Sequence, residues 1–249
     1  MKLKQIVEIL AKSIKECHLV EALYVKGSIA RNEEDEYSNI NLVCVVDEAN
    51  ILTFQEKKLD LLRSYQEILY THEAPTLPLV IIYEDGTEVD LTIVDSIALH
   101  ETDSFQILFD PKGLLKHLIV QPLQLTDEDV RLLIDRFSYQ MFEFAKAYCR
   151  GDGLYALHLA YALHQAYTQL YRYVKQPIYS KIPSKGFLMS LNHEDKEAFL
   201  ATSRLLRYDT SLQATQKIVE AMQQVIVNLP LMITIAINYV FFEYGKRKI

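Results

Sequence analysis

The hydrophobic positions in the first part of the chain change between helical and strand-like spacing. Residues 2–17 place apolar side chains three and four positions apart, which predicts an amphipathic helix. Residues 19–26 and 40–46 are short apolar runs typical of strands. The second run is nearly continuous, as in a strand that is buried on both faces. Residues 51–62 predict another helix, so this part of the chain mixes helices with strands.

Two further apolar runs, 77–83 and 88–94, flank the dipeptide Asp85-Gly86. An Asp-Gly pair between strand-like runs predicts a β-hairpin. Apolar and polar residues alternate in the second run, which places Asp90 on the face opposite its apolar neighbours. Residues 105–109 predict a further short strand, and turn-forming residues follow it.

The pattern becomes purely helical after residue 126. Thr126 precedes three acidic residues, which predicts a helix N-cap and a helix reaching about residue 150. A second helix is expected over 154–175. Asn192 is expected to cap a third, reaching residue 207, and a fourth, long helix should open at 209 or 210.

These elements predict an α+β fold with two domains. Residues 1–120 would form a mixed sheet with flanking helices, and residues 121–249 an α-helical bundle. The apolar stretch 225–242 is the one membrane-span candidate, but its polar residues and Pro230 favour a buried helix kinked at the proline over a membrane segment. This last helix could pair with its own bundle or with a second copy in a homodimer.

The charge distribution limits the classes of partner that the protein could bind, and the cysteine content indicates its redox environment. The net charge is −7; residues 1–120 carry a balance of −10 and residues 121–249 a balance of +3. Neither half supplies the basic field that nucleic acid requires, so no nucleic-acid partner is expected. The acidic half suits a cation or a cationic small molecule better. Three scattered cysteines, with no metal-binding spacing, fit a reduced cytoplasmic protein.

The candidate chemistry lies in residues 27–42. A strand that ends in Gly27-Ser28 lets the backbone and the serine hydroxyl approach a phosphate closely. Asn39 and Asn41 stand two apart on the next strand, so both side chains should share one face. Carboxylates at these two positions, with one from a neighbouring strand, would hold two Mg²⁺ ions for displacement at phosphorus.

This stretch resembles the signature of the nucleotidyltransferase superfamily, which includes DNA polymerase beta and the aminoglycoside and lincosamide adenylyltransferases. That signature is Gly-Ser, often Ala-Arg, then Asp, then Ser-Asp-hydrophobic-Asp-Leu. Eight positions fall in register, namely Gly27, Ser28, Ala30, Arg31, Asp35, Ser38, Ile40 and Leu42. Asp90 matches the family's third carboxylate, whereas Asn39 and Asn41 replace the other two.

The resemblance implies a role for each of these residues. Gly27, Ser28 and Arg31 would contact nucleotide phosphates. Asp90 would be the remaining catalytic carboxylate and would hold at most one metal ion weakly, because the amides of Asn39 and Asn41 bring no negative charge. By analogy with the family, Glu143 in the helical half is a speculative general base. Mg²⁺ and ATP would be cofactors of an active protein, and an inactive one needs no cofactor.

The helical half also holds a segment that is rich in tyrosine and histidine. The interior of an aromatic bundle is the favoured interpretation, and the alternative is a pocket in which rings stack on a ligand. The residues concerned are Tyr155, His158, Tyr161, His164, Tyr167, Tyr171 and Tyr173.

Three hypotheses follow, and they leave open whether the protein is an enzyme. The favoured one is a catalytically impaired, nucleotidyltransferase-like pseudoenzyme that retains nucleotide or small-molecule binding. The alternative is an active adenylyltransferase that moves a nucleoside monophosphate from ATP to a hydroxyl of a small, antibiotic-like acceptor. The third is a structural partner protein that binds no nucleotide.

Overall fold

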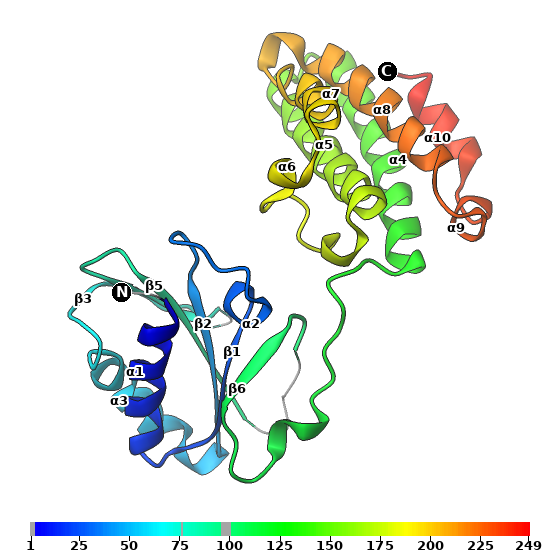
Figure 1. The fold of residues 1–249 in the computed structure, drawn as a ribbon. Helices are drawn as coiled ribbons and strands as arrows, with labels where there is room; N and C mark the ends of the chain where they lie inside the picture. The colour runs from blue at the N-terminus through cyan, green and yellow to red at the C-terminus, as the bar shows by residue number, and fades with distance from the viewer. Residues whose placement is uncertain (1–2, 76, 96–100) are drawn as a thin grey trace. The chain divides into compact units, whose positions relative to one another are not determined.

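The computed structural model describes residues 3–75, 77–95 and 101–249 (Figure 1). The backbone divides into two units, Met1–Gln121 and Pro122–Ile249. We call them the α/β unit and the helical unit. The largest hydrophobic core draws its residues from the helical unit alone, and two smaller cores draw theirs from the α/β unit alone.

The α/β unit is built on a six-stranded mixed sheet with the strand order β3-β4-β5-β2-β1-β6, in which β2 and β5 run parallel and the other neighbours are antiparallel. Its elements are α1 (Leu3–Glu16), β1 (Val20–Lys26), α2 (Ser28–Arg31), β2 (Ile40–Val46), α3 (Ile51–Leu62), β3 (Ile68–His72), β4 (Leu79–Tyr83), β5 (Glu88–Val94) and β6 (Phe105–Phe109), with 3-10 turns η1 (Glu48–Asn50) and η2 (Leu114–His117). The α+β expectation is confirmed.

Strand β2 lies near the middle of the sheet and is buried on both faces, as its apolar run predicted. One face packs with apolar residues of α1 and α3, including Leu10 and Phe54. Helices α1 and α3 lie side by side in Figure 1. The opposite face packs Val43 and Val45 with Tyr24 and with Leu115 of η2. A strand held from both sides cannot shift its register cheaply, because a one-residue slip would turn every side chain to the other face.

The predicted hairpin joins β4 to β5. Gly86 adopts a φ of +83°, and the Tyr83 amide donates to the Thr87 carbonyl at 3.0 Å. The Asp85 carboxylate also accepts from the Thr87 amide at 3.0 Å, which closes the turn. The hairpin brings β5 beside β2, where Asp90 faces Asn41 in the pairing register.

The helical unit contains α4 (Asp127–Cys149), α5 (Gly153–Lys175), η3 (Pro177–Tyr179), α6 (Phe187–Ser190), α7 (His193–Ser203), η4 (Tyr208–Thr210), α8 (Ser211–Val227), α9 (Leu231–Ile235) and α10 (Tyr239–Lys246). The Thr126 N-cap is confirmed as a capping box with Asp129. Asn192 caps α7 as predicted, accepting from the Asp195 amide at 2.8 Å. Helix α7 ends at Ser203, short of the expected residue 207, because an irregular segment leads into η4.

The prediction of one buried C-terminal helix kinked at Pro230 is wrong. Helix α8 ends at Val227, Pro230 precedes the short α9, and Asn238 caps α10 by accepting from the Phe241 amide at 3.1 Å. Proline offers no N–H for an i→i−4 hydrogen bond, and Asn238 provides the N-cap of a separate helix. The segment therefore forms separate helices instead of one kinked helix. Several apolar side chains here are exposed, among them Val240 at 81%.

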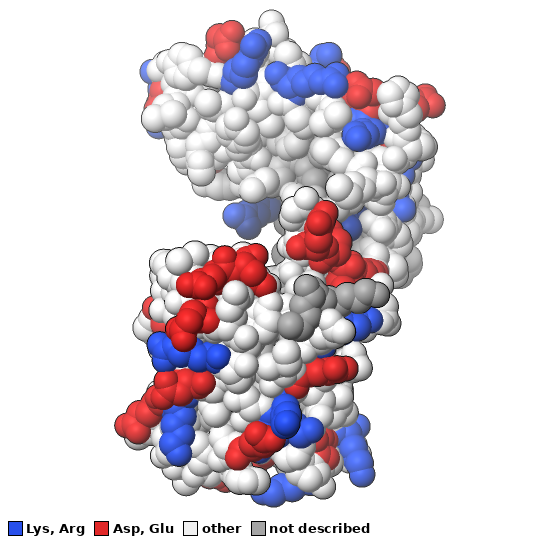
Figure 2. Space-filling model, turned by 60° about the vertical axis from the view of Figure 1, so that its left-hand side comes forward, with Lys and Arg blue, Asp and Glu red and all other residues white. Residues whose placement is uncertain are grey.

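None of the helices within the described residues is long and apolar enough to span a membrane. On the visible face of the α/β unit, acidic and basic side chains are interspersed, and no continuous basic stripe runs across it (Figure 2). On the helical unit, acidic and basic side chains lie along the upper part of the visible face, above a broad area of uncharged residues (Figure 2).

Candidate functional site

The parallel pairing of β2 with β5 creates the candidate site. Asn41 lies opposite Asp90 in the register, and Asn39 lies one residue before β2 on the same face as Asn41. The neighbours Ile40, Leu42, Val89 and Leu91 all turn into the core. The three polar side chains therefore gather on the other face, and we call them the Asn-Asn-Asp cluster.

Hydrogen bonds link the cluster into a chain. The Asn39 side-chain amide donates to a carboxylate oxygen of Asp90. The Asn41 amide in turn approaches the Asn39 carbonyl oxygen at 3.4 Å. Turning the Asn39 amide around would set its oxygen against the negatively charged oxygen of Asp90, so this orientation is the favourable one. The amides therefore occupy the side of Asp90 on which two carboxylates would face a metal.

The donor set does not fit the two-metal arrangement that the sequence resemblance implies. Two Mg²⁺ ions need several carboxylate oxygens to offset their charge, and the Asn-Asn-Asp cluster offers one carboxylate. Throughout residues 3–75, 77–95 and 101–249, no three His, Cys, Asp or Glu side chains are grouped so that they could hold a metal ion.

The Gly27–Ser28 turn lies directly beside the cluster. Gly27 adopts a φ of +80° and a ψ of −145°, which only glycine accommodates easily, and α2 starts at Ser28. A Cβ at Gly27 would lie 3.2 Å from the Asn41 amide nitrogen and 3.9 Å from a carboxylate oxygen of Asp103. A side chain at Gly27 would therefore crowd the Asn41 amide, which would have to move by a few tenths of an ångström. The Gly27 amide donates to the Ser104 carbonyl at 3.1 Å.

Arg31, the expected phosphate contact, is held in an ion pair. Its guanidinium donates to both carboxylate oxygens of Asp103 and, through Nε, to Glu33 at 2.8 Å. The Arg31 and Asp103 side chains are only 17% and 19% exposed. A phosphate that approached Arg31 would have to compete with Asp103 for the same donors.

The sequence analysis did not identify Glu101, whose side chain is only 1% exposed and lies near the Gly27–Ser28 turn. Glu101 accepts from the Tyr24 hydroxyl at 3.1 Å, from Lys26 Nζ at 3.2 Å and from the amides of Thr102 and Asp103. Burial, with the nearby negative charge of Glu101, raises the pKa of the Tyr24 phenol. The run 101–104 is an ordinary polar loop in sequence, and nothing in its spacing signals a partnership with β1.

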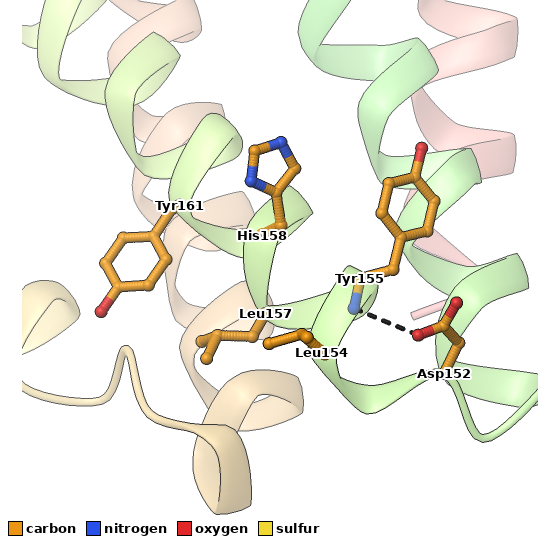
Figure 3. Close-up of a pocket in the computed structure, with 6 residues that line it drawn as sticks. All are labelled: Asp152, Leu154, Tyr155, Leu157, His158 and Tyr161. Atoms are coloured by element: carbon orange, nitrogen blue, oxygen red, sulfur yellow. Dashed lines mark hydrogen bonds between the residues drawn. The ribbon is translucent and has the colours of Figure 1, made fainter.

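Glu143, the general base expected by family analogy, lies on α4, and its carboxylate accepts from Lys146 one turn later at 2.7 Å. It belongs to the helical unit, whereas the Asn-Asn-Asp cluster belongs to the α/β unit. Asp152, another acid of the helical unit, is the N-cap of α5 and accepts from the Tyr155 amide at 3.2 Å, as Figure 3 shows.

The aromatic segment of α5 divides into an exposed and a buried part. Tyr155, His158 and Tyr161 line an open pocket of about 510 Å³ together with Leu154 and Leu157 (Figure 3). For this part the expected bundle interior is wrong, because Tyr155 and Tyr161 are nearly half exposed.

The later part of the segment does form the expected aromatic interior. His164, Tyr167 and Tyr171 pack with Phe187 and Phe199. Burial lowers the pKa of His164 to about 4, and its Nε2 lies 2.8 Å from the Ser203 hydroxyl.

The sequence model of the streptomycin adenylyltransferase family matches residues 1–236. The chain therefore belongs to the streptomycin adenylyltransferase family, within the nucleotidyltransferase superfamily that its residues 27–42 resemble. No curated protein sequence matches the chain.

Two solved adenyltransferase structures align with the chain over nearly its whole length. One is an aminoglycoside 6-adenyltransferase from Bacillus subtilis, at 10% identity and a TM-score of 0.36, covering 100% of this chain and 98% of that one. The other is a spectinomycin adenyltransferase from Enterococcus faecialis, solved with ATP and spectinomycin, at 13% identity and a TM-score of 0.36, covering 99% and 97%.

Proposed function

We propose that this member of the family binds a nucleotide or a small molecule but does not carry out metal-dependent adenylyl transfer. The observation that carries the proposal is the hydrogen bond from the Asn39 amide to Asp90, with Asn41 next in the chain. An attraction between unit charges at about 4 Å is worth on the order of 4 kcal/mol at the effective dielectric near a protein surface. Two missing carboxylates therefore remove most of the driving force for holding a pair of divalent ions.

The Gly27–Ser28 turn supports continued ligand binding. The positive φ of Gly27 keeps the backbone open toward the cluster, and the Ser28 hydroxyl makes no hydrogen bond with another described residue. Hydroxyl and backbone donors of such a turn can hold a phosphate without a metal ion. The three cysteines are unpaired, which supports a reducing, cytoplasmic setting.

Titration calorimetry of the full chain with ATP, once with MgCl₂ and once with EDTA, tests the proposal. We expect similar affinities in both buffers and no pyrophosphate release when streptomycin or spectinomycin is added. Ser28→Ala should weaken ATP binding, whereas the matched control Ser64→Ala, at an exposed position, should not. Tight binding that requires Mg²⁺, together with pyrophosphate release, would refute the proposal.

An active adenylyltransferase is the second candidate, and the extent of the family match favours it, because residues 1–236 cover all of the α/β unit and most of the helical unit. Such an enzyme would move a nucleoside monophosphate from ATP to a hydroxyl of a small, antibiotic-like acceptor. It would have to work with Asp90 as the one carboxylate of the cluster and, by family analogy, with Glu143 as base. The same pyrophosphate assay decides between the candidates.

A further inference from the structure

A polar pocket of about 270 Å³ lies within the helical unit, apart from the Asn-Asn-Asp cluster. One face of α4, one face of α5 and the loop after η3 form its walls. Its lining residues are Leu133, Arg136, Gln140, Ala162, Gln165, Ala166, Gln169, Pro183 and Ser184. None of these lining residues is acidic, so the pocket has no carboxylate to attract a cation.

Three glutamines give the pocket its hydrogen-bonding character. Each primary amide offers donors and an acceptor, which match a ligand hydroxyl that both donates and accepts. The Oε1 atom of Gln140 is buried and has no hydrogen-bond partner among the residues that the structure describes. An unpaired buried amide oxygen costs stability, and rotation toward a ligand donor would recover that loss. Gln140 therefore favours an occupant rich in hydroxyl groups.

Arg136 contributes to the pocket a positive charge that is not paired with any described residue. Its guanidinium forms no ion pair or hydrogen bond with any other described residue, and its side chain is exposed. Arg131, one and a half turns earlier on α4, is by contrast paired with both Glu128 and Asp135. A free guanidinium presents a planar fork of donors that suits a carboxylate or a phosphate.

A buried arginine holds one wall of the pocket in place. Arg172 is 5% exposed, and its Nη1 donates to the carbonyl of Lys185 at 2.7 Å and to the carbonyl of Ile182. The guanidinium also packs over the rings of Tyr179 and Phe187. These contacts fix the loop that carries Pro183 and Ser184, so the pocket exists before a ligand arrives and binding has little ordering to overcome.

We propose that this pocket binds a small polyhydroxylated anion, such as a sugar phosphate or a sugar acid. The amides of Gln140, Gln165 and Gln169 would hold the hydroxyl groups, and Arg136 would hold the anionic group. A polycationic aminoglycoside is disfavoured, because it would meet Arg136 without a compensating acid in the lining. The inference concerns the helical unit and does not depend on whether the α/β unit transfers a nucleotide.

NMR spectra of the ¹⁵N-labelled full chain test the proposal, because they report the glutamine side-chain amides directly. The probes are glucose 6-phosphate, glucuronate, neutral glucose and cationic glucosamine. We expect the two anions to shift the side-chain signals of Gln140, Gln165 and Gln169, with glucose weaker and glucosamine weakest. The signals of the Gly27–Ser28 turn serve as the internal reference that separates this pocket from phosphate binding in the α/β unit.

Substitutions sharpen the test. Arg136→Gln should weaken anion binding about tenfold or more, as expected for the loss of a charge-assisted hydrogen bond. The matched control Arg150→Gln, an exposed arginine at the end of α4, should leave affinity unchanged. Gln140→Leu should weaken binding while it raises thermal stability. The proposal fails if neither anion shifts the glutamine signals at about 10 mM, a concentration that detects even millimolar affinity, or if glucosamine binds as well as the anions.

Discussion

Replacing both asparagines by aspartate, Asn39→Asp with Asn41→Asp, should make the stability of the α/β unit depend on divalent cations. In the native chain the Asn39 amide donates to Asp90. In the double variant a carboxylate takes its place, and the aspartate at position 41 adds a third carboxylate to the cluster. The variant therefore exchanges an attraction for a repulsion, and a bound Mg²⁺ would turn that repulsion into coordination.

The magnitude follows from two contributions. Two like charges at about 4 Å repel by on the order of 4 kcal/mol at an effective dielectric of 20, and the lost hydrogen bond to a charged group adds about 1.5–3 kcal/mol. Solvent and proton uptake by one carboxyl reduce this sum, because the side chains are partly exposed. We expect a net loss of about 2–4 kcal/mol in EDTA. Mg²⁺ at a hundred times its Kd should return about 2.7 kcal/mol.

Urea unfolding followed by far-ultraviolet circular dichroism measures both effects, since the chain has no tryptophan for fluorescence. The native chain and the uncharged control Asn39→Ala with Asn41→Ala should unfold alike in EDTA and in MgCl₂. Only the double aspartate variant should gain stability from the metal. If its two unfolding curves coincide, the three positions do not form a potential metal site and the reasoning is wrong.

Three further predictions concern single residues. Gly27→Ala should lower the free energy of unfolding by about 1–3 kcal/mol, because its backbone angles suit glycine alone; an unchanged urea midpoint would show that the turn can reshape. Glu101→Gln should cost about 2–3 kcal/mol through its weakened bond to Lys26 and should bring the pKa of Tyr24 back toward its ordinary value; an unaltered ultraviolet titration of the phenol would contradict this. Burial lowers the pKa of His164 from 6.5 to about 4, so the unfolded chain binds the extra proton, and stability should fall by about 1–3 kcal/mol as the pH drops from 6.5 to 4. His164→Gln should remove that dependence, whereas His158→Gln, at an exposed position, should retain it.

The sequence predicts the centre of the α/β unit well because several local signals agree there. The continuous apolar run of β2, the Asp-Gly turn before β5 and the alternation around Asp90 each point to the same sheet. Two-residue periodicity then brings Asn39, Asn41 and Asp90 together without knowledge of the fold. The relative positions of these three residues can therefore be predicted from the local sequence pattern. The direction of the hydrogen bonds between their side chains can be seen only in the folded structure.

The parts that escaped prediction lack such agreement. Strand β3 lies at the sheet edge with four of its five side chains exposed, so it shows no apolar alternation. The four-residue helix α2 is too short to show a period. The pairing of Arg31 with Asp103 joins residues 72 positions apart, and its existence depends on how β6 packs against β1. Contacts between residues so far apart in the chain cannot be predicted from the spacing of residue types along the sequence.

The separation of the hydrophobic cores has a consequence for how the protein tolerates change. Among the described residues, each of the three apolar clusters draws its members from one unit, so a substitution inside a cluster disturbs first the packing of its own unit. Substitutions that compensate for a change in one core are accordingly to be sought within the same unit.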